Sequence, residues 1–186
     1  MPKKAIILLA DGFEDVEAVT PVDYLSRAGI QVTTVSISEN LTVTSKWGRI
    51  KILADVTLAD LIKQNDNWDA AIVPGGMPGS ANLAASRKTG ELLIKMSDAK
   101  KLICAICAAP AIVLHPLGII KGKNFTCYPG MEDKAADANW SADSVVIDDN
   151  IITSRGAGTA GLWSIAIIEK LIDKETAEKI AKTVLL

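Results

Sequence analysis

Histidine is almost absent from this sequence: His115 is the only one among 186 residues. Enzymes that use a cysteine or serine as nucleophile usually need a histidine as the base that activates it. Cysteine is scarce as well, since Cys104, Cys107 and Cys127 are an odd number and too few for a disulfide framework. The sequence therefore argues against a disulfide-rich fold. Whether a Cys–His pair exists depends entirely on the position of His115.

A surplus of charge and long apolar runs are also missing. The net charge is −2, so no excess of basic residues indicates binding to nucleic acid or to an acidic membrane surface. No run approaches the roughly 20 apolar residues of a membrane span. The apolar run AIILLA at 5–10 follows two lysines but is too short for a signal peptide. We expect a cytoplasmic protein that binds neither nucleic acid nor a membrane.

Strand-like and helix-like patterns alternate along the chain. The predicted strands are 5–10, 30–37, 69–76, 101–106, 124–129, 144–149 and 151–154, with a hairpin at 41–55. The predicted helices are 14–29, 57–64, 90–100, a helix opening at 109–114, and two closing helices at 158–172 and 174–186. The chain has no repeat, low-complexity segment or linker, so residues 1–186 are expected to form one domain. The alternation predicts an α/β fold with a mostly parallel sheet covered by helices on both faces.

Parallel sheets of this kind place ligands at the carboxyl ends of their strands. Three loops that follow predicted strands are therefore candidates for a site: DGFEDVE (11–17), PGGMPGS (74–80) and CAAPA (107–111). Cys107 stands at a strand-to-helix turn, where free backbone N–H groups and the positive end of the helix dipole lower the pKa of a thiol. The same pattern also fits a small buried cysteine at the start of a helix.

His115 is too far along the chain to activate Cys107. If 108–115 is one helix, the eight residues between them correspond to about 12 Å along its axis, whereas a hydrogen bond to a base needs about 3 Å. Pro116 follows and marks a helix end. We expect His115 at the end of the helix, near solvent.

Two further motifs have plain structural explanations. Cys104 and Cys107 form a C-x-x-C pattern, but in an extended strand their Cα atoms would lie about 10 Å apart, with the side chains on opposite faces. Ligands for a metal site are also missing. The sequence GAGTAG at 156–161 matches a dinucleotide motif, yet only helices are predicted after it, which favours a glycine turn. Arg155 beside it fits either an anion site or a surface or dimer role.

Together these segments resemble the ThiJ/PfpI superfamily, and within it the DJ-one deglycase branch. The matching blocks are ILLADGFEDVEAVTPVDYLSRAGI, AIVPGGMPGSANL, ICAICAAPA and IITSRGAGT, in family order over nearly the whole chain. The resemblance implies a flavodoxin-like three-layer sandwich, a homodimer, and a nucleophile-elbow cysteine at Cys107. It also implies that Glu17 is the acidic partner of Cys107. Without the resemblance, Glu17 would be interpreted, like Glu14 and Asp15, as an acid that complements a helix dipole.

The chemistry of such a pair gives directions for both pKa values. A protonated Glu17 can donate a hydrogen bond that stabilises the thiolate, whereas an ionised Glu17 would repel it. We therefore expect a raised pKa for Glu17 and a lowered pKa for Cys107. The resemblance further implies an oxyanion hole made by the backbone N–H groups of Gly76 and Ala108.

The resemblance also places arginines near the dimer's active site. Arg27 matches one of them, and a second falls near Lys46 or Arg49, where the register is open. Two positions depart from the family pattern. Ala108 stands where the protease-like branch has a histidine, so peptidase activity is not expected. Tyr128 stands where the deglycase branch has a histidine, and a tyrosine is a poor base at neutral pH.

The sequence thus predicts a cysteine-dependent glyoxalase or deglycase, without cofactor or metal, acting on small reactive carbonyls such as methylglyoxal in carbonyl or oxidative stress. The expected site residues are Cys107, Glu17, Gly76, Ala108 and Tyr128. The alternative is a redox sensor or holdase chaperone in which Cys107 oxidises to a sulfinate held by Glu17. A role in thiamine precursor metabolism is suggested only by the family name.

Overall fold

A computed structural model describes residues 2–64 and 67–186. Its main sheet has seven strands in the order β10-β11-β7-β6-β1-β2-β5. All neighbouring strands pair in parallel except β10, which runs antiparallel to β11. The strands are β1 (Lys4–Leu9), β2 (Gln31–Ser36), β5 (Val56–Thr57), β6 (Ala70–Val73), β7 (Leu102–Ile106), β10 (Val145–Asp148) and β11 (Ile151–Ser154). Two small separate ladders pair β3 (Thr42–Thr44) with β4 (Lys51–Leu53), and β8 (Asn124–Phe125) with β9 (Asn139–Trp140).

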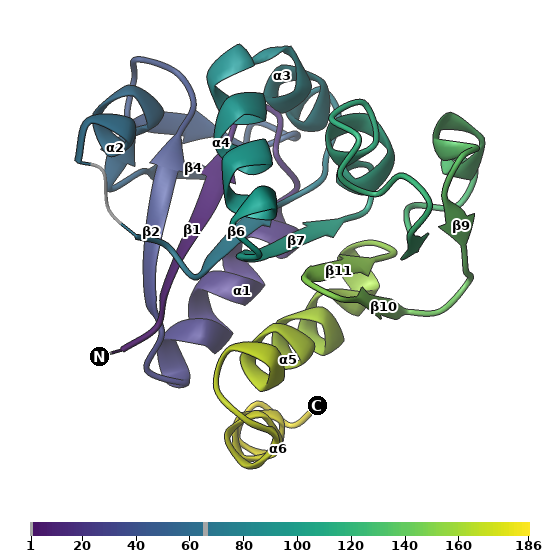
Figure 1. Ribbon diagram of the computed structural model, residues 1–186. Helices are drawn as coiled ribbons and strands as arrows, with labels where there is room; N and C mark the ends of the chain where they lie inside the picture. Colours follow the sequence, from purple (N-terminus) through teal and green to yellow (C-terminus); the bar gives the residue numbers. More distant parts are fainter. Residues whose placement is uncertain (1, 65–66) are drawn as a thin grey trace.

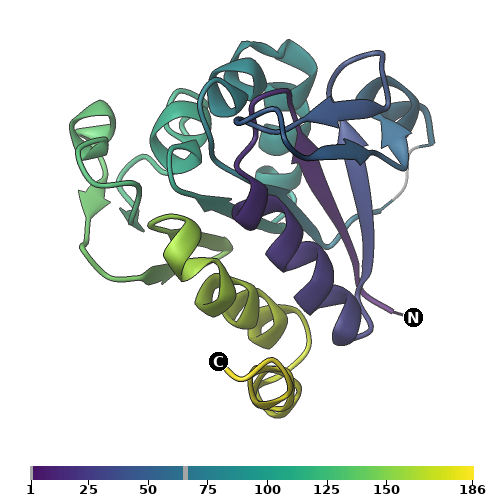
Figure 2. The same ribbon diagram turned by 180° about the vertical axis from the view of Figure 1, so that it is seen from behind.

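Helices cover both faces of the sheet (Figure 1). They are α1 (Asp15–Arg27), α2 (Leu58–Gln64), α3 (Gly79–Ala85), α4 (Arg87–Asp98), α5 (Ala160–Leu171) and α6 (Lys174–Thr183), with short turns η1 (Pro110–Leu114), η2 (Glu132–Ala135) and η3 (Ala157–Thr159). One face carries α2, α3, α4 and η1, and the other carries α1 and α5, with α6 beside α5 (Figure 2). This arrangement confirms the predicted sandwich.

Strand β1 shows why the sheet needs a layer of helices on each of its two faces. Ile6 and Leu8 pack in the core formed with α2, α3 and α4, whereas Ala5, Ile7 and Leu9 pack in the core formed with α1 and α5. All five side chains are buried. A strand that is apolar on both faces is stable only at the centre of a sheet with a helical layer on each side. None of the helices in the described ranges is long and apolar enough to cross a membrane.

Several observed elements differ from the prediction. The segment 79–85 forms helix α3, which the sequence analysis did not predict because Gly, Ser and Asn there are typical of a turn. The strand predicted at 124–129 is confined to β8, at Asn124 and Phe125. It stops because the next N–H, of Thr126, donates to the side-chain oxygen Oγ1 of Thr153 (2.9 Å) rather than to a neighbouring strand.

The helix predicted to open at 109–114 is present but is wound as one π-turn. Pro110 has no N–H, and the N–H of His115 donates to its carbonyl five residues back (3.0 Å). The turn thus begins directly after Cys107–Ala109 and places His115 at its end.

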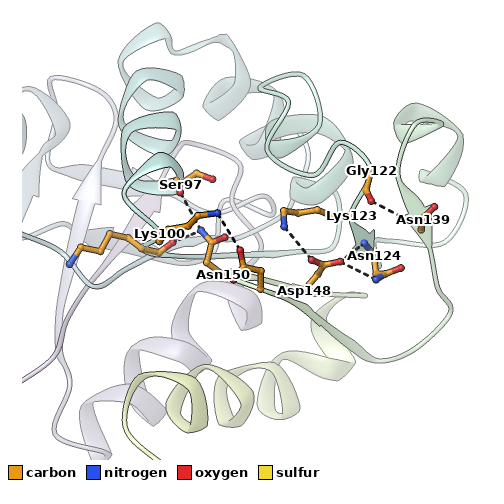
Figure 3. Close-up of polar contacts among 10 residues, drawn as sticks. Ser97, Lys100, Gly122, Lys123, Asn124, Asn139, Asp148 and Asn150 are labelled. Atoms are coloured by element: carbon orange, nitrogen blue, oxygen red, sulfur yellow. Dashed lines mark hydrogen bonds and ion pairs between the residues drawn. The ribbon is translucent and has the colours of Figure 1, made fainter.

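The segment between η1 and β10 is an excursion outside the main sheet and is tied back to it by polar contacts. Asp148 on β10 accepts hydrogen bonds from the backbone N–H of Asn124 (2.8 Å) and from Lys123 Nζ (3.2 Å) (Figure 3). Asn150, before β11, donates to the carbonyl of Lys101 (2.9 Å). These contacts fix the base of the excursion, whose first turn carries Tyr128 toward the end of β7.

Candidate active site

The carboxyl ends of β1, β6 and β7 bring the three candidate loops together. Glu17 lies in the first turn of α1 after β1, Gly76 in the loop after β6, and Cys107 directly after β7. With Ala108 and Tyr128 they line one pocket of about 250 Å³. The structure therefore brings together all five residues that the sequence analysis proposed for the site.

Cys107 sits at a sharp strand-to-helix turn. Its φ is +63°, a left-handed conformation that is uncommon for a residue with a side chain. Its backbone is held on both sides, because its N–H donates to the carbonyl of Ser154 (2.9 Å) and its own carbonyl accepts from the N–H of Tyr128 (2.8 Å). The turn pushes the thiol out of the sheet plane into the pocket, where it is partly exposed.

Glu17 is buried beside this thiol, with 1% of its surface exposed. Its Oε2 accepts a hydrogen bond from the N–H of Gly75 (2.9 Å). Within the described part of the chain, Oε1 is buried without a conventional donor. The carboxyl interacts with the thiol of Cys107. The backbone of Glu17 is fixed by Glu14, whose side chain caps α1 by accepting the Glu17 N–H (2.9 Å).

Burial raises the pKa of Glu17 to about 7, and the negative charge of Glu14 adds to this effect. The Cys107 thiol, the Gly75 N–H and the positive charge of Lys46 act in the opposite direction. The predicted raised pKa of Glu17 is confirmed. At neutral pH the carboxyl is therefore able both to donate and to accept a proton.

The predicted lowering of the Cys107 pKa is wrong. The pKa of the thiol is raised to about 12, mainly by burial and in addition by the charge and the hydrogen bond of the adjacent Glu17 carboxyl. The backbone N–H groups of Gly76 and Ala108 lower it but do not compensate. The prediction considered the helix start and a protonated Glu17, but not the burial of the thiol, which is the largest cause of the raised pKa.

Two groups this close titrate as one unit. The pair loses its first proton near pH 7, from Glu17, and the resulting state is chiefly the thiol beside a carboxylate. Transfer of the remaining proton from sulfur to Glu17 generates the nucleophile without changing the net charge of the site. The pair can therefore provide a thiolate without histidine.

Gly76 and Ala108 present their backbone N–H groups to the sulfur of Cys107. Gly76 has a φ of +92°, and a Cβ at this position would lie 2.6 Å from the carbonyl oxygen of Gly12. Only glycine can adopt this conformation so close to a neighbouring loop. Two N–H donors converging beside a nucleophile are suited to stabilise an oxyanion that forms on the attacked carbon.

The basic residues considered for the site lie in different places. Lys46 lines the pocket and has its Nζ above the ring of Trp47 (4.7 Å). Arg49 does not line the pocket within this chain. Arg27 lies at the opposite end of α1 from Glu17 and is bonded to Asp23 (2.9 Å). Arg155, next to the glycine turn, donates to the carbonyl of Ala142 (3.2 Å) and so tethers a loop.

His115 plays no part in the pocket. It follows η1, and its Nε2 lies 2.6 Å from Oδ1 of Asp137, with which it forms an ion pair when protonated. The expected position at the end of the helix is confirmed. The partner Asp137 could not be predicted, because the contact joins η1 to the segment after η2.

Cys104 and Cys107 are both free thiols. Cys104 is fully buried in β7, and burial raises its pKa well above the usual range. The prediction that the two side chains point to opposite faces is wrong: both pack against the core formed with α1 and α5. Side chains alternate between the two faces of the sheet only as far as the strand continues, and the left-handed turn at Cys107 ends that alternation.

The glycine motif at 156–161 forms η3 and the start of α5, and α6 follows, as the glycine-turn interpretation predicts. Gly156 lies against the ring of Tyr128 and near Oε1 of Glu17. The sequence analysis assigned no site role to Gly75, which stands next to Gly76, because only its tertiary contact with Glu17 reveals that role. Glu14, interpreted from the sequence as an acid at the start of a helix, is the N-cap of α1.

Comparison with known proteins places this site in a family. Residues 3–170 match the model of the DJ-1/PfpI family. The chain belongs to the DJ-1/PfpI family. It is 36% identical over 180 residues to Protein DJ-1 homolog B of Arabidopsis thaliana and spans only 40% of the length of that relative.

Other relatives match this chain along its whole length. The crystal structure of Drosophila melanogaster DJ-1beta is 37% identical, with a TM-score of 0.94, and covers 100% of this chain and 99% of that one. A relative from Caenorhabditis elegans, named glutathione-independent glyoxalase DJR-1.2, is 36% identical over 183 residues, covering 97% of this chain and 95% of that protein. The DJ-1/PfpI family thus includes a protein named for glyoxalase activity.

Proposed function

We propose that this protein is a cofactor-free glyoxalase that converts small α-oxoaldehydes such as methylglyoxal, or their early adducts, into 2-hydroxy acids. One observation carries the proposal: a thiol and a buried carboxyl with a pKa of about 7 lie side by side at the end of the sheet. The pair supplies a nucleophile and an acid–base group in one place. The family and its glyoxalase-named member support this type of activity.

The reaction needs no outside oxidant. The Cys107 sulfur bonds to the aldehyde carbon, and its proton passes through Glu17 to the carbonyl oxygen, which gives a hemithioacetal and leaves Glu17 ionised. The oxyanion formed on the way lies near the N–H groups of Gly76 and Ala108. Glu17 then removes the proton from the former aldehyde carbon and returns it to the ketone carbon, while the hydroxyl proton moves from the oxygen of the first carbon to the oxygen of the second, so that the first carbon is oxidised and the second reduced. Water hydrolyses the resulting thioester and releases the 2-hydroxy acid and the thiol.

Replacement of Cys107 by serine tests this function directly. We expect turnover of methylglyoxal to lactate to fall at least 100-fold, since a hydroxyl with no strong base is a far weaker nucleophile than a thiolate. Cys104→Ala is the matched control, because that thiol is buried in β7 away from the pocket, and it should keep most of the activity. Lactate is measured enzymatically. Equal rates for wild type and Cys107→Ser would end the proposal.

The second candidate function is redox sensing, in which peroxide adds two oxygens to Cys107 to give a sulfinate. The specific observation in its favour is that Glu17 has an oxygen without a conventional donor beside the sulfur and is readily protonated near pH 7. In its protonated form it would donate a hydrogen bond to a sulfinate oxygen. Peptide mass mapping after mild peroxide distinguishes this candidate, which requires Cys107 to gain two oxygens before Cys104 and Cys127 do.

We further propose that the chain forms a homodimer. Helix α1 exposes Val16 and Val19 at 46% and 45%, and the β3–β4 hairpin exposes Trp47 at 68%. Apolar side chains gathered on neighbouring elements are typical of an interface, and two-fold symmetry is the common form of self-association. Light scattering at micromolar concentration should give about twice the chain mass of 19.7 kDa. The mass of one chain would contradict the dimer.

A further inference from the structure

The pocket around Cys107 is lined by two chemically different sets of residues. The polar set consists of Glu14, Glu17 and Lys46. The other set, which we call the apolar wall, comes from three separate loops and consists of Met77, Tyr128, Met131 and Ala157. The proposed reaction uses Cys107, Glu17 and the backbone N–H groups. The apolar wall has no part in it.

This apolar wall is built onto the backbone of the nucleophile. The N–H of Tyr128 donates to the carbonyl of Cys107 (2.8 Å), and the N–H of Met131 donates to the carbonyl of Tyr128 (3.1 Å). Met77 directly follows Gly76, whose N–H points at the sulfur. The wall is thus fixed in position relative to the sulfur through two backbone hydrogen bonds and one peptide link.

The wall is also open to solvent. Met77 is 41% exposed and Tyr128 52%, so apolar surface beside the nucleophile remains for a ligand to cover. A thioether is polarizable and packs well on aromatic rings. A substrate with a polar group at this position would lose water and gain few hydrogen bonds, whereas an apolar group would gain burial.

We propose that the preferred substrates are α-oxoaldehydes whose substituent is bulky and apolar, an aryl or branched alkyl group, and that Met131 and Met77 determine this preference. The proposal rests on the proposed glyoxalase function and narrows its substrate class. With the aldehyde carbon on Cys107 and its oxygen at the Gly76 and Ala108 N–H groups, the substituent packs against the thioethers. A pocket of about 250 Å³ accommodates a phenyl ring in place of the methyl group of methylglyoxal.

The first test compares phenylglyoxal with methylglyoxal for the wild type and two matched variants. Met131→Gln keeps the length of the side chain but makes it polar, and Met131→Leu keeps it apolar. We expect wild-type kcat/KM to favour phenylglyoxal about tenfold, within the range that one apolar contact group contributes to discrimination. The glutamine variant should lose most of this preference, and the leucine variant should keep it. Comparing variants cancels the different intrinsic reactivities of the two aldehydes.

The second test does not depend on turnover. Mandelate and lactate are the hydroxy acids that the two aldehydes would yield, and they differ only by phenyl against methyl. We expect mandelate to protect Cys107 from iodoacetamide at about a tenfold lower concentration than lactate, and Met131→Gln to remove that difference. Equal protection by the two acids would overturn the inference. Preferential protection by mandelate without turnover of either aldehyde would support the apolar wall and refute the glyoxalase function instead.

Discussion

Replacing Glu17 by glutamine should stabilise the protein at pH 8 by about 2–3 kcal/mol more than it does at pH 5, and should at the same time lower its activity. Glutamine keeps the size of the side chain and can still accept the hydrogen bond from the N–H of Gly75. It has no charge at any pH, so it avoids burying a carboxylate beside Cys107. Unfolding by urea at the two pH values measures the effect.

The sign follows from the direction of the pKa shift. The pKa of Glu17 is raised from its ordinary 4.5 to about 7 in the folded protein, so the folded state binds this proton more tightly than the unfolded state does. Protonation therefore stabilises the fold. The stability of the wild type declines as pH rises from 4.5 to 7 and is constant above that range as far as this group is concerned. The glutamine variant lacks this decline.

The activity of the wild type should depend on pH in the opposite direction to its stability. Wild-type turnover should rise with pH through about 7, because the singly protonated Cys107–Glu17 pair then replaces the doubly protonated one. Glu17→Gln should lose that rise and most of the rate, a factor of about 10²–10⁴ for a missing acid–base group. Glu178→Gln, on the exposed side of α6, is the control and should change neither property. A stability gain that is the same at pH 5 and pH 8 would mean that Glu17 is not buried as a carboxyl beside the thiol.

The layered fold could be predicted because its signals are local. The runs at 5–10 and 102–106 are apolar at every position, which in a chain with alternating helices occurs only in central parallel strands. Helix α3 was missed because its local signal is misleading. Its sequence GSANLAA is typical of a turn, and the helix is stabilised by Leu83, which packs in the core. Local propensity is weak when tertiary packing determines the conformation.

The site residues could be named from the sequence, but their electrostatics could not. The turn at Cys107 is visible in CAAPA, and the resemblance supplied Glu17. The pKa of the thiol depends first on its own burial and then on the Glu17 carboxyl that α1 brings beside it. The contact between His115 and Asp137 is likewise a product of the way η1 and η2 pack. Such distances between elements are not encoded in any short stretch of sequence.

Gly75 is the position at which the smallest change should have the largest effect on the site. Its φ is compatible with any residue, so alanine introduces no backbone strain. A Cβ there would lie 2.6 Å from Oε2 of Glu17, 2.6 Å from Cβ of Cys107 and 3.0 Å from the carbonyl oxygen of Ile106. Real Cβ atoms do not approach other atoms so closely. The added methyl group must therefore displace the carboxyl, the thiol or both.

Gly75→Ala should reduce turnover at least 100-fold, because a displacement of about 1 Å between reacting groups has an effect of that size. It should lower the free energy of unfolding by only about 1–3 kcal/mol, the usual effect of overpacking at one position. Gly158→Ala is the matched control: it adds the same methyl group in the nearby turn η3, where a Cβ would meet no atom within 4 Å. Urea unfolding and methylglyoxal turnover of both variants separate damage to the site from damage to the fold. If Gly75→Ala kept wild-type turnover, the contact between Glu17 and Cys107 would not be needed for the chemistry, and the proton transfer between them would have to be abandoned as the source of the nucleophile.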